Sequence, residues 1–128
     1  MFWVWKQACG DPQNGIGPTG NGLETVDCAT GRDLPRDPVK AAELSRAYPR
    51  AVPGVLTALS SSPATGTAPR ALTLEGTAGS GSCRLDLWVP GDVRPSPLVR
   101  NITDLTLRQV PGGWRIGGCA TGPYRLTL

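Results

Sequence analysis

Histidine is absent from this chain of 128 residues, and lysine is scarce, with only Lys6 and Lys40. Without histidine, neither Ser-His-Asp nor Cys-His catalytic arrangements can be built from this chain alone, and histidine-containing zinc sites are excluded in the same way. A pair of carboxylates remains as a catalytic option, with Asp86 and Asp104 as candidates. No local pairing of acidic residues supports it, so we predict no catalytic residue and no enzyme.

Long basic runs are also lacking, although the formal net charge is +3. The arginines are spread singly along the chain, with no run of three basic residues. Nucleic-acid-binding proteins usually concentrate basic charge on one face, near aromatic residues that stack on bases. We therefore predict no nucleic-acid partner.

A glycine-rich motif, Gly15-Ile-Gly17-Pro-Thr-Gly20, formally matches the dinucleotide-binding pattern G-x-G-x-x-G. That pattern binds phosphate only where a strand precedes it and a helix follows it. Pro18 and the following Gly-Asn-Gly argue against a helix at this point. The segment therefore predicts a loop and no cofactor.

The four cysteines lack the C-x-x-C spacing that zinc sites favour, so we predict no bound metal. Their even number, wide separation and Gly/Pro-rich flanks favour two disulfides, which we expect to be Cys9–Cys28 and Cys83–Cys119. Four reduced, buried thiols are the alternative. Disulfides imply an oxidising compartment, so the prediction is a secreted or cell-envelope protein on the extracytoplasmic side.

Hydrophobic runs long enough for a signal peptide or a membrane span are missing, because Lys6 and Gln7 end the apolar start Met1–Trp5. An extracytoplasmic chain needs such a segment. We therefore expect that Met1 is an introduced start and that an upstream signal, membrane anchor or lipid anchor is missing from this sequence.

Two regions follow from the distribution of turn residues. Glycine, proline and asparagine dominate residues 10–22, which predicts a loop-rich segment over residues 1–36 held closed by the Cys9–Cys28 disulfide. Residues 37–128 are predicted to form a single domain of one helix followed by an antiparallel sheet.

The helix is predicted from Asp37 and Pro38, which suit the N-cap and the first helical position. It should run from Val39 to Tyr48 and be interrupted by the prolines that follow. A second short helix is predicted from Pro53 to Leu59, because Val55, Leu56 and Leu59 have helical spacing.

Beyond Arg70 apolar and polar residues alternate, as in half-buried strands. Gly79 to Ser82 is predicted to be a turn, and Pro111-Gly112-Gly113 a hairpin. The fold class is therefore α+β, with a disulfide-clasped N-terminal loop, a Pro-interrupted helix and a four- to five-stranded antiparallel meander. The apolar positions of the expected strands are Leu72, Leu74, Leu85, Leu87, Val89, Leu105, Leu107, Trp114, Ile116, Tyr124, Leu126 and Leu128.

For function the sequence favours a non-enzymatic binding or assembly module that recognises a protein or a surface, or assembles with itself. Trp88 lies on the face opposite Leu85 and Leu87, so it is a candidate partner-binding residue, with Arg84 and Arg108 at the rim. An exposed anchor and a tryptophan covered by a neighbouring loop are both open.

The alternative function is a small-molecule-binding domain. Its apolar pocket would lie between the helix and the sheet, lined by Leu56, Leu59, Leu87 and Trp114.

Overall fold

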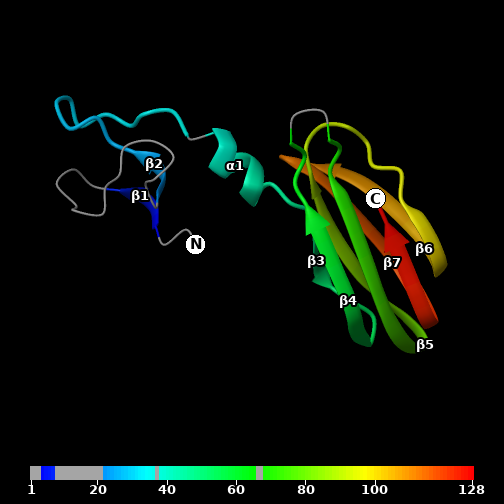
Figure 1. Ribbon diagram of the computed structural model, residues 1–128. Helices are drawn as coiled ribbons and strands as arrows, with labels where there is room; N and C mark the ends of the chain where they lie inside the picture. Colours follow the sequence, from blue (N-terminus) through cyan, green and yellow to red (C-terminus); the bar gives the residue numbers. More distant parts are fainter. Residues whose placement is uncertain (1–3, 8–21, 37, 66–67) are drawn as a thin grey trace. The chain divides into compact units, whose positions relative to one another are not determined.

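The computed structural model describes residues 4–7, 22–36, 38–65 and 68–128 (Figure 1). The chain divides into two compact units, Met1–Leu44 and Ser45–Leu128. The predicted boundary after residue 36 stays a prediction.

The first unit contains a two-stranded parallel sheet and a short helix. Strand β1 (Val4–Gln7) pairs with β2 (Gly22–Thr25). Helix α1 (Pro38–Leu44) has seven residues, so the predicted helix exists but ends four residues before Tyr48. Pro38 suits the first helical turn, where its missing N–H has no intrahelical acceptor. The predicted N-cap Asp37 lies outside the described residues, as do residues 1–3 and 8–21 of the predicted N-terminal segment.

The second unit is an antiparallel sheet of five strands. They are β3 (Tyr48–Ala51), β4 (Val55–Ser62), β5 (Ala71–Pro90), β6 (Leu98–Val110) and β7 (Gly113–Thr127). The strand order is β3-β5-β7-β6, and β4 also pairs with β5. The predicted sequential meander is therefore wrong, because β7 lies between β5 and β6. A meander was inferred from short connections, but only β6 and β7 are joined by the predicted tight hairpin at residues 111–112.

Two local predictions are corrected here. The segment predicted as a second helix, Pro53 to Leu59, lies largely in β4, whose residues pair with β5 from Val55 to Ser62. Backbone pairing with a long neighbouring strand decides this segment, overriding a weak helical spacing. The predicted turn at Gly79 to Ser82 lies inside β5, which continues for 20 residues through it.

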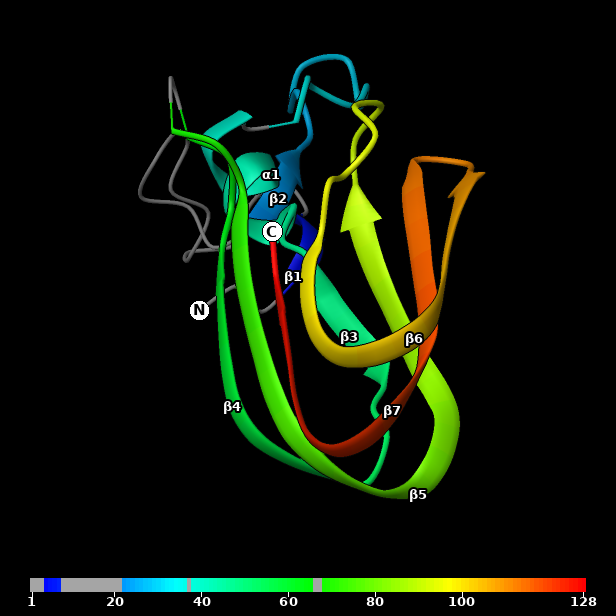
Figure 2. The same cartoon turned by 90° about the vertical axis from the view of Figure 1, so that its right-hand side faces the viewer.

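The long strands bend, so that the sheet folds back on itself (Figure 2). In β5 the register shifts between Ala78 and Leu85, around Gly81 at φ 60°. In β6 it shifts at Asn101 and Asp104, which have φ of 55° and 51°. Asparagine and aspartate tolerate this left-handed conformation better than other non-glycine residues. Bulges of this kind re-aim a strand, so each strand contributes to both sides of the folded sheet.

The folded sheet has two halves that share β5, β6 and β7. The β4 half consists of β4, residues 71–78 of β5, 98–100 of β6 and 122–127 of β7. The β3 half consists of β3, residues 85–90 of β5, 106–110 of β6 and 113–118 of β7.

The core lies on the inner faces of both halves. In β5 the buried positions are even-numbered from Leu72 to Ala78 and odd-numbered from Leu85 to Val89. The bend therefore reverses the alternation, which keeps both segments facing the same core. The apolar strand positions identified in the sequence all belong to this core or pack against it. Its buried apolar members are Ala47, Leu72, Leu74, Ala78, Leu85, Leu87, Val89, Ile102, Ile116, Ala120, Tyr124 and Leu126, with Leu105, Leu107, Trp114 and Leu128 packed against them.

The predicted Cys83–Cys119 disulfide is confirmed and joins β5 to β7 at the bend between the two halves. The predicted Cys9–Cys28 disulfide involves Cys9, which lies outside the described residues.

Candidate functional site

The outer face of the β3 half carries a row of side chains that crosses four neighbouring strands. The register pairs Tyr48 with Trp88, Trp88 with Arg115, and Arg115 with Arg108. Residues paired across antiparallel strands point to the same side of the sheet. The row, which we call the outer row, therefore spans β3, β5, β7 and β6, a distance of about 14 Å at the usual inter-strand spacing.

The aromatic end of this row consists of Tyr48 and, next to Arg115, Trp88. The neighbours of Trp88 in the strand, Leu87 and Val89, point into the core, so alternation sends the indole outward, where it is half-buried. A Cβ at Gly113 would lie 3.0 Å from the Trp88 ring, and one at Gly112 would lie 3.7 Å from it. The β6–β7 turn thus covers part of the ring and fixes its position. Tyr48, beside it, is 50% exposed.

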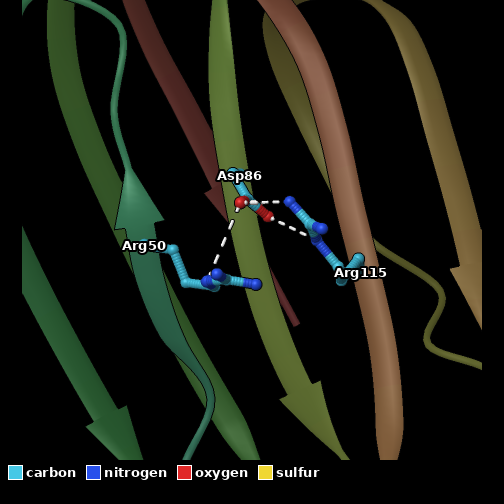
Figure 3. Close-up of polar contacts among 3 residues, drawn as sticks. All are labelled: Arg50, Asp86 and Arg115. Carbon is cyan, nitrogen blue, oxygen red and sulfur yellow. Dashed lines mark hydrogen bonds and ion pairs between the residues drawn. The ribbon is translucent and has the colours of Figure 1, made fainter. Parts of the chain in front are cut away.

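Asp86 occupies the next outward position on β5. Its carboxylate accepts two hydrogen bonds from Arg115, from Nε at 3.1 Å and from Nη2 at 2.5 Å, and Arg50 Nε lies 3.8 Å away (Figure 3). The hydrogen bond and the charge of Asp86 raise the pKa of Arg115. Asp86 is thereby held between guanidinium groups from two neighbouring strands, β3 and β7.

A groove of about 300 Å³ opens beside this cluster. Its lining consists of Leu85, Asp86, Thr106, Arg108, Arg115 and Gly117. Thr106 Oγ1 lies 2.8 Å from the place where a Cβ of Gly117 would stand. Glycine at position 117 therefore leaves room for the Thr106 hydroxyl in the groove. Together with Arg50, the charged residues here comprise three guanidinium groups and one carboxylate.

A second groove, of about 240 Å³, lies in the β4 half, where its lining includes Glu75, Arg100, Tyr124 and Arg125. Glu75 forms an ion pair with Arg125 at 3.2 Å, and the Tyr124 hydroxyl donates to the Pro53 carbonyl at 3.0 Å. Glu75, Arg125 and Tyr124 thus have partners within the protein, and Arg100 lies opposite Arg125 in the register of β6 and β7.

The structure brings together two of the three predicted partner-binding residues. Trp88 and Arg108 are both in the outer row, whereas Arg84 is exposed at the register shift that precedes Leu85. Their role in binding stays a prediction. Sequence reasoning missed Tyr48, which it placed at a helix end, and Arg115, although the inward neighbours Trp114 and Ile116 were recognised.

The sequence analysis left two alternatives open: catalysis by a pair of carboxylates and a small-molecule pocket. Asp86 and Asp104 do not share a groove: Asp86 pairs with Arg115, and Asp104 accepts a hydrogen bond from Thr103. The apolar pocket predicted between helix and sheet stays a prediction. Leu87 is fully buried, and Leu56 and Leu59 are 39% and 47% exposed on β4.

Within the described residues, no helix is long and apolar enough to cross a membrane. The same part of the chain contains no group of three or more Cys, Asp or Glu side chains placed to hold a metal ion.

Comparison with known proteins gives one informative similarity. No protein-family model and no curated protein matches the chain. A solved structure described as "Crystal structure of endogalactoceramidase" is similar, with 35% sequence identity and a TM-score of 0.58. The alignment covers 80% of this chain and 19% of the solved protein, so this chain spans about a fifth of that enzyme's length.

Proposed function

We propose that this chain is a non-catalytic binding module of a glycolipid-cleaving enzyme, and that the outer row of the β3 half recognises galactose-bearing lipid surfaces. The outer row is the observation that carries the proposal. It places two aromatic rings directly beside hydrogen-bonding charged groups on one accessible face.

The chemistry of this face suits a sugar. An aromatic ring offers an apolar surface for the C–H face of a pyranose, and its placement beside polar groups sets orientation. Carboxylate oxygens accept hydrogen bonds from sugar hydroxyls, and guanidinium groups donate to them. Trp88 and Tyr48 supply the aromatic surface, while Asp86, Arg115 and Arg108 supply the hydrogen-bonding groups.

The similarity to endogalactoceramidase supports the ligand class. That enzyme's name describes action on galactose-bearing ceramides, and four-fifths of its length lies outside the matched part. We assign the cleavage of the lipid to a part of such an enzyme outside the matched region, and the recognition of the lipid surface to this module. The Cys83–Cys119 disulfide fits an oxidising, extracytoplasmic location.

The test is binding to vesicles of phosphatidylcholine with and without 10% galactosylceramide, followed by co-sedimentation. We expect galactosylceramide to increase the bound fraction, and Trp88→Ala to remove most of that increase. Truncating an aromatic anchor at the centre of an interface typically costs ~2 kcal/mol or more, which is roughly thirtyfold in affinity.

Leu98→Ser is the matched control, because Leu98 is a 74% exposed apolar residue in the β4 half. It should leave binding unchanged. Equal losses in Trp88→Ala and Leu98→Ser would indicate unspecific apolar adsorption, and no dependence on galactosylceramide would overturn the proposal.

A second candidate, assembly with a protein partner or with itself, is favoured by the edge strand β4. Its described pairing is with β5 alone, and Val55, Leu56 and Leu59 are exposed on it. Unpaired edges with exposed apolar residues promote strand addition. Light scattering coupled to size-exclusion chromatography tests self-assembly: a dimer that Leu59→Lys dissociates supports it, and a monomer at all concentrations contradicts it.

A further inference from the structure

The groove beside the outer row carries more positive charge than a neutral sugar requires. Arg50 and Arg115 pair with a single carboxylate, that of Asp86, and Arg108 lines the same groove. The Asp86 carboxylate already pairs with Arg115 and Arg50, so it does not compensate the positive charge of Arg108. The excess positive charge therefore lies on the Arg108 side of the groove.

Arg108 differs from the other two arginines in its contacts. Among the described residues it forms no hydrogen bond or ion pair, and it lines the groove. It lies directly opposite Arg115 in the register of β6 and β7. Like charges placed opposite each other destabilise a sheet, and an anion bound between them would relieve that repulsion.

The donors around this point suit an oxygen-rich anion. Arg115 uses Nε and Nη2 on Asp86, which leaves Nη1 for another acceptor. Arg108 contributes its whole fork of N–H groups, and the Thr106 hydroxyl stands in the space left by Gly117. Guanidinium groups bind sulfate and phosphate oxygens with charge-assisted hydrogen bonds, which are stronger than neutral ones.

We infer that the groove between Arg108, Arg115 and Thr106 binds a tetrahedral oxyanion carried by a lipid headgroup, either a sulfate ester or a phosphate. The inference rests on the proposed function, because it adds an anion subsite to the same lipid-binding face. The aromatic end of the row then contacts the sugar or headgroup, and the arginine end selects its charge.

The experiment compares four vesicle compositions with the full chain: phosphatidylcholine alone, and the same lipid with 10% galactosylceramide, sulfated galactosylceramide or phosphatidylglycerol. We expect at least one anionic lipid to tighten binding roughly fivefold over galactosylceramide, the effect of one arginine beside an anionic headgroup. Tightening by the sulfated lipid alone identifies a sulfate ester as the source of the oxyanion. Equal tightening by phosphatidylglycerol, whose phosphate lacks the balancing choline cation of phosphatidylcholine, identifies the phosphate.

Two arginine variants separate the groove from general attraction of charge. Arg108→Gln should abolish the preference for the anionic lipid, whereas Arg94→Gln, an equal change of charge in the exposed loop 91–97, should retain it. Equal effects of the two variants, or no tightening by either anionic lipid, would overturn the anion subsite. Far-UV circular dichroism and a thermal melt of both variants confirm that they are folded.

The vesicle experiment also distinguishes a failure of this inference from a failure of the proposed function. If galactosylceramide raises binding but the anionic lipids add nothing, the anion subsite fails and the proposed function stands. If galactosylceramide has no effect on binding, the proposed function fails, and Arg108→Gln against Arg94→Gln on phosphatidylglycerol still tests the subsite.

Discussion

The two halves of the folded sheet share three strands and one core, yet their outer faces differ. On the β4 half, β5 presents Thr73, Glu75 and Thr77, and Glu75 pairs with Arg125. On the β3 half the same strand presents Asp86 and Trp88, and Asp86 pairs with Arg50 of β3 and Arg115 of β7. Inner positions are set by packing in both halves, so the difference in the outer positions points to function in the β3 half.

The largest expected effect concerns the bend that joins the halves. Replacing both Cys83 and Cys119 with serine removes a disulfide that closes a loop with a sequence separation of 36. Loop-closure entropy predicts a loss of about 4 kcal/mol in the free energy of unfolding. Urea denaturation measures it, and we expect a single transition because both halves share the core. A loss below about 1 kcal/mol would contradict this role of the bridge.

The next effect is confined to the interior of the β4 half. A Cβ at Gly76 would contact the Tyr124 hydroxyl, the adjacent ring carbon and the Val55 carbonyl, all within 2.7 Å. We expect Gly76→Ala to cost roughly 3 kcal/mol through overpacking. Gly79→Ala is the control, since nothing lies within 4 Å of its Cβ position. Equal denaturation midpoints for the two variants would show that the β4 half is loosely packed.

A smaller, pH-dependent effect involves Tyr124, whose pKa is raised by burial. Tyr124→Phe removes its hydrogen bond to the Pro53 carbonyl and should cost about 1 kcal/mol at neutral pH. The unfolded chain loses the tyrosine proton near pH 10, before the folded protein does, so this contribution is complete below pH 10 and declines above it. Urea denaturation at pH 8 and pH 11 should show the difference between wild type and variant shrinking. A constant difference would argue against a buried, protonated hydroxyl.

The smallest effects compare the ion pairs on the two outer faces. Asp86→Asn should lower the melting temperature slightly more than Glu75→Gln does. Asp86 makes two hydrogen bonds to one guanidinium and its side chain is 23% exposed, against 39% for Glu75. A thermal melt at low and high salt measures both, and added salt should reduce the difference. A larger decrease in melting temperature for Glu75→Gln than for Asp86→Asn would contradict the difference between the ion pairs of the two outer faces.

The sequence predicted the interior better than the topology. Period-two alternation identified Leu72, Leu87, Ile116 and Leu126 correctly, because each lies in a strand segment that is buried on one face only. The same pattern could not show that Gly79 to Ser82 continues a strand, since a bend and a turn use the same residue types. The order β3-β5-β7-β6 depends on long-range pairing, which leaves no local signal.

The candidate site was predictable only in part, for a similar reason. Trp88 and Arg108 were recognised as outward residues of separate strands, but the pairing of each with Arg115 follows from the register. Tyr48 was missed because the short helix ends earlier than Pro49 suggested, and β3 begins in its place. A site assembled across four strands requires their order as well as their faces.

The central claim, that recognition lies in the outer row of the β3 half, is tested most directly by an NMR titration. Backbone amide shifts of the ¹⁵N-labelled chain are followed as a soluble β-galactoside, or its sulfated form, is added. We predict that the changes concentrate at Tyr48, Trp88, Arg108 and Arg115 and spare Thr73, Thr77 and Arg125. Changes centred on the β4 half, or none at saturating ligand, would contradict the account.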